Sequence, residues 1–302
     1  MNRGVIHMTI SKITGVIPAL VTPINSNEII DEEGLIRLIK YLIDSGVTGI
    51  FPLGSMGEFA PLEEKERFDL LEKVVDIVDK RVPVLAGVSD TGTKRVIKNA
   101  LKAKEIGADA VVALLPFFYF LNQRAILDFY MDVAEASLLP VVIYHNPTMT
   151  KIRIEFDTIA KLSEHNNIIG IKDSSCDYEL FIKLLDLKSD KFFVLQGDER
   201  RLKEALLAGA DGLVTGVGNV AIEIFVRLYK SAKENKVKEV EELQNKVNKL
   251  LSFCRDSWIQ AIKYGLKLRG ICEEYTCRPF CPVDEDTRSS VKTILEELRI
   301  LQ

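Results

Sequence analysis

Short apolar runs and longer amphipathic stretches alternate along most of this chain of 302 residues. The runs are rich in β-branched residues and nearly free of polar ones, which is typical of parallel strands covered by helices on both faces. Eight such runs occur, at residues 15–22, 49–53, 82–88, 110–115, 140–144, 168–172, 192–195 and 212–215. The alternation therefore predicts an α/β protein built on a parallel sheet.

The stretches between the runs have the periodicity of helices. After Asp31, a suitable N-cap, apolar residues recur at helical spacing over 35–43. Gly46, Gly107 and Gly209 each separate such a stretch from the next apolar run, and glycine suits the left-handed position that ends a helix. Eight strand–helix units fit a closed (β/α)₈ TIM barrel better than an open doubly wound sheet, which is the alternative.

The pattern changes near residue 225, where the strand-like runs stop and apolar residues recur at helical spacing. We therefore expect a barrel over 1–224 that carries the active site, and a C-terminal helical region over 225–302 that packs on it. The last helix is predicted from near Asp286 to Leu298, after a loop marked by Pro279 and Pro282.

The charge balance indicates a small-molecule partner. Lys and Arg number 40 against 44 Asp and Glu, a net charge of −4, so no basic field is available for nucleic acid or an anionic membrane. The longest apolar run, 110–121, contains Pro116 and is shorter than the ~18 residues of a membrane span. The five cysteines form no C-x-x-C pair and the first residues lack a signal-peptide pattern, so we expect a cytoplasmic protein.

Lys172 is the only lysine in the eight apolar runs. Function in parallel α/β barrels gathers at the carboxyl ends of strands, where this residue lies. An ammonium group inside a barrel either pairs with a carboxylate or loses its proton, and a neutral lysine attacks carbonyl carbon to form a Schiff base. A structural ion pair, for example with the neighbouring Asp173, is the alternative interpretation.

Two further strand ends carry reactive groups. Tyr144 ends the strand run before that of Lys172, so its phenol could exchange protons with an amine there or simply fill the barrel mouth. The turn from Gly54 to Gly57 has small residues around the Ser55 hydroxyl, which would let backbone N–H groups approach a carboxylate. Each signal is weak by itself.

Other polar residues give weaker signals. Cys272, Cys277 and Cys281 have a spacing that matches no common metal signature, so we predict no metal site and interpret them as packing residues. Cys176 follows the Lys172 motif closely enough for a thiol reagent to block the pocket. His145 should point away from Tyr144, outside the pocket, because successive strand residues face opposite sides.

Taken together, three motifs resemble those of one family. They are G-I-K-D-S-S around Lys172, Y-H-N-P from Tyr144, and G-S-M-G-E-F from Gly54, and the opening G-V-I-P-A-L-V-T-P is similar to the family's first strand. The chain resembles, over essentially its whole length, the pyruvate-dependent class I aldolases of the dihydrodipicolinate synthase and N-acetylneuraminate lyase family. The resemblance implies a TIM barrel that acts on pyruvate or on a 2-oxo acid cleaved to pyruvate.

The resemblance also implies roles for individual residues. Lys172 would form the Schiff base, so no cofactor is needed beyond this covalent imine, and Tyr144 would be the acid/base tyrosine. Ser55 would belong to the proton relay, and with the N–H of Met56 it would hold the carboxylate of pyruvate. Gly197 and the backbone of Val214 would line the same pocket.

Two departures from the family pattern bear on the substrate. Dihydrodipicolinate synthases carry an arginine two residues after the proline of the Y-H-N-P motif, where it grips a carboxylate, but this chain has Met149. They also place a second relay tyrosine where this chain has Phe118, so the relay is incomplete unless Tyr119 reaches in. These changes favour an aldolase of 2-keto-3-deoxy sugar acids, such as 2-keto-3-deoxygluconate, over a dihydrodipicolinate synthase or an N-acetylneuraminate lyase.

Two alternatives come from other classes. One is a non-catalytic barrel that binds 2-oxo acids, and the other is a phosphate-binding barrel enzyme that uses the loops after the last two strands. Because the family commonly forms dimers and tetramers, the resemblance implies a homotetramer or homodimer whose small-molecule partners are pyruvate and an aldehyde.

Overall fold

A computed structural model describes residues 13–254 and 257–301. In this part of the chain, seven parallel strands are joined in the order β1-β7-β6-β5-β4-β3-β2. Their bounds are Gly15–Pro18 (β1), Leu85–Gly87 (β2), Ala110–Leu114 (β3), Val141–His145 (β4), Ile168–Asp173 (β5), Phe193–Gln196 (β6) and Gly212–Thr215 (β7). Nearly every strand residue is buried, as expected for strands covered on both faces.

The predicted run 49–53 fills the remaining position between β1 and β2. Isolated parallel bridges join Phe51 to Ala19, just after β1, and Ile50 to Val84, just before β2. The ladder is short because Pro52 follows at once and has no N–H to donate. The run therefore closes the sheet, and the predicted (β/α)₈ TIM barrel is confirmed.

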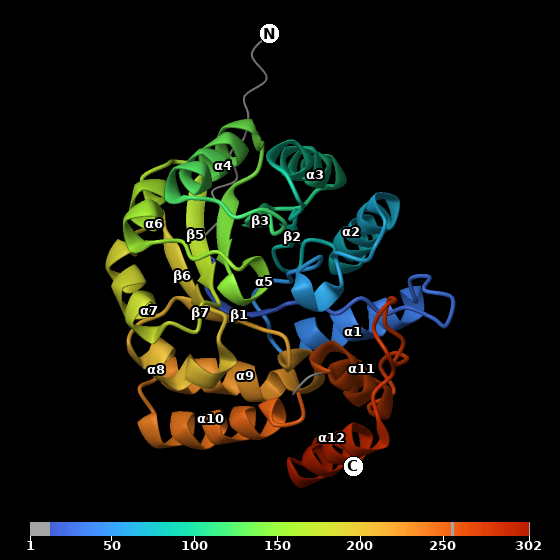
Figure 1. Cartoon of the computed structure of the whole chain (residues 1–302). Coiled ribbons are helices and arrows are strands. Elements are labelled where there is room, and N and C mark those ends of the chain that lie inside the picture. Colours follow the sequence, from blue (N-terminus) through green and yellow to red (C-terminus); the bar gives the residue numbers. More distant parts are fainter. Residues whose placement is uncertain (1–12, 255–256, 302) are drawn as a thin grey trace.

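Helices surround the strands, as Figure 1 shows. They are α1 (Glu32–Asp44), α2 (Glu64–Val78), α3 (Thr93–Ile106), α4 (Gln123–Ala136), α5 (Pro147–Thr150), α6 (Phe156–Ser163), α7 (Tyr178–Leu184), α8 (Leu202–Leu207) and α9 (Gly218–Lys233). The predicted N-cap is confirmed, because the Asp31 side chain accepts the N–H of Gly34 at 3.0 Å. Gly46, Gly107 and Gly209 take φ values of 92°, 107° and 103°, so the predicted glycine joints are also confirmed.

The C-terminal helical region consists of α10 (Val237–Leu251), α11 (Trp258–Leu268) and α12 (Glu285–Glu297). These helices gather on one side of the barrel, next to α8, α9 and α1 (Figure 1). The last helix begins and ends within one residue of its predicted bounds. The boundary predicted between residues 224 and 225 falls inside α9, which packs on β1 and β7 as well as on α10, so the division into 1–224 and 225–302 stays a prediction.

None of the helices in the described ranges 13–254 and 257–301 is long and apolar enough to cross a membrane.

Candidate active site

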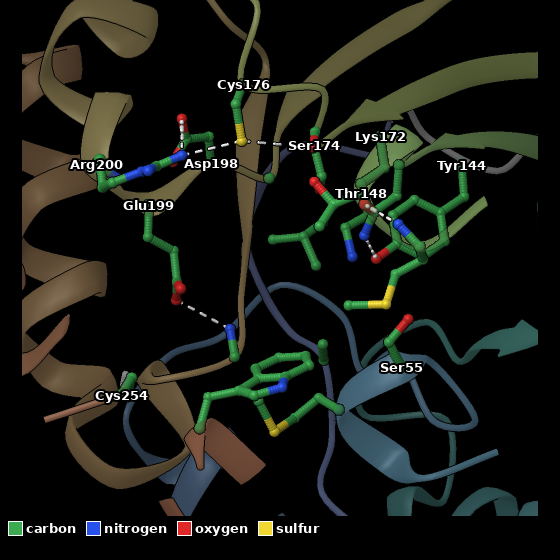
Figure 2. A pocket seen from close by; sticks show the side chains of 18 of the residues that line it. Ser55, Tyr144, Thr148, Lys172, Ser174, Cys176, Asp198, Glu199, Arg200 and Cys254 are labelled. Carbon is green, nitrogen blue, oxygen red and sulfur yellow. Dashed lines mark hydrogen bonds and ion pairs between the residues drawn. The ribbon is translucent and has the colours of Figure 1, made fainter. Parts of the chain in front are cut away.

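The carboxyl ends of the strands surround a cavity of about 540 Å³. All six residues that the sequence analysis placed at the active site line this cavity: Lys172, Tyr144, Ser55, Met56, Gly197 and Val214. Other residues that line the cavity include Asn146, Thr148, Met149, Ser174, Cys176, Asp198, Glu199, Arg200, Cys254 and Trp258. Figure 2 shows Lys172 and Tyr144 on one side of the cavity and Glu199 and Arg200 on the other.

Lys172 and Tyr144 are direct neighbours across β4 and β5. Their Cα atoms pair in the register of the two strands, and both side chains are about 5% exposed (6% and 5%). The Nζ atom of Lys172 lies 3.9 Å from the centre of the Tyr144 ring and 5.0 Å from that of Phe51. The buried amine therefore lies against two aromatic rings.

The structure does not support an ion pair between Lys172 and Asp173. The Asp173 carboxylate lies on the opposite side of β5, where it contacts Nδ1 of His145 at 2.8 Å and accepts the Ser175 hydroxyl at 2.9 Å. The N–H of Ile154 donates to Nε2 of His145, so Nδ1 carries the proton that is donated to Asp173. His145 thus lies outside the pocket, as predicted, and orients a carboxylate away from Lys172.

The environment of Tyr144 favours its ionised form. Burial raises the pKa of Tyr144, but the charge of Lys172 and hydrogen bonds with Asn146, Ser55 and Lys172 outweigh burial, so the pKa is lowered from the ordinary tyrosine value. The contact with Asn146 is a hydrogen bond from Nδ2 to the Tyr144 Oη at 3.0 Å. A phenol in this environment can give up and take back a proton.

The Ser55 hydroxyl and the Met56 backbone belong to a 3₁₀ turn, η1 (Ser55–Gly57), that faces Tyr144 across the cavity. The turn packs closely on the loop after β7, because a Cβ atom on Gly216 would lie 2.8 Å from the Met56 side chain. Gly197 is also closely packed, because a Cβ atom at this position would lie 2.1 Å from Ser174 Oγ and 3.1 Å from Lys172 Cε. These two glycines leave space for the catalytic candidates.

Glu199 on the opposite wall was missed by the sequence analysis. Its Oε1 accepts the Thr215 hydroxyl and the N–H groups of Gly216 (2.9 Å) and Val217 (3.1 Å). Burial raises the pKa of Glu199, although these hydrogen bonds and the charge of Lys172 act to lower it. Strand β6 ends at Gln196, and Glu199 lies beyond that strand end, in the 3₁₀ turn η3 (Glu199–Arg201), so a search that stops at the strand ends does not reach it.

Arg200 and Cys176 stand at the mouth of the cavity. The Arg200 guanidinium donates to both carboxylate oxygens of Asp198, at 2.8 and 3.2 Å, and contacts Cys176 Sγ at 2.9 Å. The Arg200 charge is therefore already paired. Cys176 lines the cavity, so the block of the pocket by a thiol reagent stays a prediction that this position supports.

The two departures from the family pattern differ in position. Met149 lines the cavity, in the position where the resemblance places an arginine in dihydrodipicolinate synthases. Phe118 and Tyr119 are 74% and 72% exposed, and neither lines the cavity. Within a single chain, Tyr119 does not supply the relay hydroxyl that Phe118 lacks.

The cysteine-rich segment near the C-terminus provides no cluster of metal ligands. Cys272 and Cys277 are buried and Cys281 is exposed. Burial raises the pKa of both Cys272 and Cys277 to about 12, which disfavours the thiolates that bind metals. In the described part of the chain, no group of three or more His, Cys, Asp or Glu side chains is arranged to hold a metal ion.

Comparison with known proteins agrees with this geometry. The chain matches the model of the dihydrodipicolinate synthetase family over residues 12–298. It is 31% identical to a 4-hydroxy-tetrahydrodipicolinate synthase of Methanothrix thermoacetophila, over 94% of this chain and 96% of the relative. It is also 31% identical to a probable 2-dehydro-3-deoxy-D-pentonate aldolase of Escherichia coli K12, over 96% of this chain and 99% of the relative.

A solved structure shows the same fold. It is a prophage protein of the dihydrodipicolinic acid synthase family from Escherichia coli K12, determined in complex with pyruvate. The TM-score is 0.91 at 29% identity, over 95% of this chain and 99% of that one. The chain therefore belongs to the dihydrodipicolinate synthetase family of class I, pyruvate-dependent lyases.

Proposed function

We propose that this enzyme is a Schiff-base aldolase that cleaves or forms a 2-keto-3-deoxy sugar acid, such as 2-keto-3-deoxygluconate, with pyruvate as one component. The observation that carries the proposal is the buried pair of Lys172 and Tyr144 at the bottom of a cavity whose far wall is polar. The 2-oxo acid end would lie at Lys172, and the hydroxylated end would reach toward the mouth.

The reaction begins at Lys172. Its ammonium group gives a proton to the Tyr144 phenolate, and the free amine attacks C2 of the 2-oxo acid. Tyr144 returns that proton to the departing hydroxyl, so water leaves and an iminium ion forms. The Ser55 hydroxyl and the N–H of Met56 hold the substrate carboxylate, while Gly197 and the backbone of Val214 shape the wall beside it. The iminium withdraws electrons, so the proposal requires no metal or organic cofactor.

Tyr144 moves the protons. In the cleavage direction its phenolate removes the proton of the C4 hydroxyl, the C3–C4 bond breaks, and an aldehyde leaves. The electron pair of that bond forms an enamine with the iminium carbon. Protonation at C3 and hydrolysis of the imine then release pyruvate and free Lys172. The lowered pKa of Tyr144 supports its role as the base.

The lining of the cavity supports a polyhydroxylated aldehyde. Thr148, Ser174 and Glu199 offer hydroxyl and carboxylate groups, which hydrogen-bond sugar hydroxyls. Met149 offers no charge for a carboxylate, and the charge of Arg200 is already paired with Asp198. An aldehyde that carries its own carboxylate therefore lacks a free cationic partner in this part of the wall.

The second candidate is a 4-hydroxy-tetrahydrodipicolinate synthase, which condenses pyruvate with aspartate semialdehyde. The 31% identity to a relative of that name favours it. The test is a direct comparison of purified enzyme on 2-keto-3-deoxygluconate cleavage and on condensation of pyruvate with aspartate semialdehyde. We expect a kcat/KM at least about 100-fold higher with the sugar acid. A preference for aspartate semialdehyde would replace the proposal with the second candidate.

We also infer a homotetramer or homodimer. Phe118, Tyr119 and Phe120 stand in sequence with exposures of 74%, 72% and 86%, and adjacent exposed aromatic side chains mark association surfaces. The cysteine pattern keeps a cytoplasmic location as our expectation. Sedimentation of the purified protein, compared with a Phe118→Ser/Phe120→Ser variant, tests the oligomer. A monomeric wild type would contradict it.

A further inference from the structure

A buried ion pair joins the barrel to the C-terminal helical region behind the Ser55 turn. The Oε1 atom of Glu58 lies 2.5 Å from Nζ of Lys263 on α11, and both side chains are 0% exposed. Taking two charges out of water is costly, and apolar side chains of similar volume often give equal stability. The buried ion pair between Glu58 and Lys263 therefore suggests a role other than stabilising the fold.

Glu58 directly follows η1, the turn that carries Ser55 and Met56. It has a left-handed backbone with φ 56° and ψ 36°, and its N–H donates to the Ser55 carbonyl at 3.3 Å. Glycine adopts this conformation without strain, whereas other residues pay about 1–2 kcal/mol. A glutamate at this position indicates that the contacts of its carboxylate offset the backbone strain.

The side chain of Glu58 is held at both oxygens. Besides the ion pair with Lys263, Oε2 accepts the N–H of Cys277 at 2.7 Å. Lys263 in turn donates to the carbonyl of Tyr275 at 2.6 Å. Glu58 and Lys263 therefore tie the end of η1 to both α11 and the segment that follows it.

The other side of the turn is attached to the barrel. The Thr22 hydroxyl donates to the Gly57 carbonyl at 2.6 Å, and a Cβ on Gly57 would lie 2.9 Å from the Leu20 carbonyl. The turn is thus clamped between the chain that follows β1 and the C-terminal helical region. A shift of the C-terminal attachment would move the Ser55 hydroxyl and the Met56 N–H relative to Lys172.

We propose that Glu58 and Lys263 are positioning residues, through which the C-terminal helical region holds the turn that binds the carboxylate of the 2-oxo acid. This inference rests on the proposed function, in which Ser55 and Met56 hold that carboxylate. It predicts that loss of the pair weakens binding of carboxylate-bearing substrates, while imine formation at Lys172 with a ketone that has no carboxylate stays the same.

The test uses double variants, because removal of one partner alone would leave a buried charge and could prevent folding. Glu58→Leu/Lys263→Met replaces the pair by apolar side chains and removes the bond to Cys277. Glu58→Gln/Lys263→Met keeps an oxygen that can accept the Cys277 N–H. The matched control is Lys249→Met/Glu297→Gln, which removes a half-exposed ion pair between α10 and α12 that does not touch η1.

Each protein is treated with borohydride in graded concentrations of pyruvate or of acetone, which lacks the carboxylate, and modified Lys172 is quantified by peptide mass spectrometry. We expect the half-saturating pyruvate concentration to rise about tenfold in Glu58→Leu/Lys263→Met and about threefold in Glu58→Gln/Lys263→Met. The control variant and every acetone series should match wild type. Thermal melts identify the folded variants, and if the apolar variant does not fold, the glutamine variant decides.

An unchanged half-saturating pyruvate concentration in a folded variant would overturn the inference, as would an equal loss of labelling with acetone, which would indicate general damage. Absence of a pyruvate adduct in wild type would be a different failure: it would overturn the proposed function and, with it, this inference.

Discussion

The Nζ atom of Lys172 lies 3.9 Å from the centre of the Tyr144 ring, and the two residues pair across adjacent strands. The ring face attracts a cation, and the phenol oxygen is held by Asn146. Meanwhile the nearest carboxylate in sequence, Asp173, is held by His145 on the opposite side of β5. This arrangement places an amine and a phenol at the bottom of the cavity and turns the carboxylate of the adjacent residue, Asp173, away from them.

Replacement of Tyr144 by phenylalanine should separate the two halves of the reaction. Tyr144→Phe keeps the ring beside Lys172 but removes the hydroxyl that moves protons, so aldol turnover should fall by about 10²- to 10⁴-fold while slow imine formation persists. Steady-state cleavage rates and borohydride trapping measure the two steps separately. Tyr229→Phe is the control, because the Tyr229 hydroxyl also donates to a backbone carbonyl, that of Asp211, but Tyr229 lies on α9 and does not line the cavity. An unchanged rate in Tyr144→Phe would move the proton transfer to another group.

The pH profile should report the hydrogen bond between Asn146 and Tyr144. If Tyr144 acts as a phenolate, kcat rises with pH through its pKa, which is lowered from the ordinary value partly by Asn146. Asn146→Asp keeps the oxygen that accepts the Met149 N–H but removes the donor to the phenol and adds a negative charge. The pKa of Tyr144 should therefore rise, and the ascending limb of kcat should move to higher pH. A limb that stays in place or moves to lower pH would contradict this role for Asn146.

Met149→Arg should change which aldehyde is accepted. The side chain lines the cavity, so an arginine there would offer a cation to a carboxylate-bearing aldehyde. We expect the ratio of kcat/KM for aspartate semialdehyde to that for sugar-derived aldehydes to rise about tenfold or more, as measured in condensation with pyruvate. Met149→Leu is the control for loss of the thioether. If the ratio does not change, residue 149 does not select the aldehyde.

Alkylation should inactivate the enzyme through Cys176. Burial and the charge of Asp198 raise the pKa of this thiol, so inactivation by iodoacetamide should accelerate as the pH rises toward that pKa. Cys254 also lines the cavity, but burial raises its pKa still more strongly, well above the ordinary value. Cys176→Ser should therefore be inactivated about tenfold more slowly than wild type. Equal inactivation rates would place the reactive thiol elsewhere.

The fold was largely predictable because its signal is local. Apolar runs covered on both faces give the strands, and the glycine joints give the ends of helices. The run 49–53 was found in sequence even though Pro52 leaves it only isolated bridges in the structure. The extent of the strand at 15–22 was overestimated, because only Gly15–Pro18 continues in the ladder with β7.

Active-site residues at the ends of strands could be predicted from the sequence. Glu199, in a turn beyond a strand, could not. Lys172 and Tyr144 stood out because strand ends are where barrels keep reactive groups. Glu199 lies in a turn after β6, and because acidic residues are common in turns, the sequence does not mark it as part of the site. The pairing of Glu58 with Lys263 joins residues far apart in the chain, and nothing in the spacing of either residue indicates the other.

Lys172 is expected to form an imine with pyruvate. Borohydride reduction of wild type and Lys172→Ala in excess pyruvate, followed by peptide mass spectrometry, tests it directly, with Lys183→Ala on α7 as a control for loss of an exposed lysine. We expect a reduced pyruvyl adduct on Lys172 in wild type and in Lys183→Ala, and none in a folded Lys172→Ala variant. Folded wild type that gives no adduct would contradict Schiff-base catalysis by Lys172 and make the non-catalytic 2-oxo-acid-binding barrel the leading explanation.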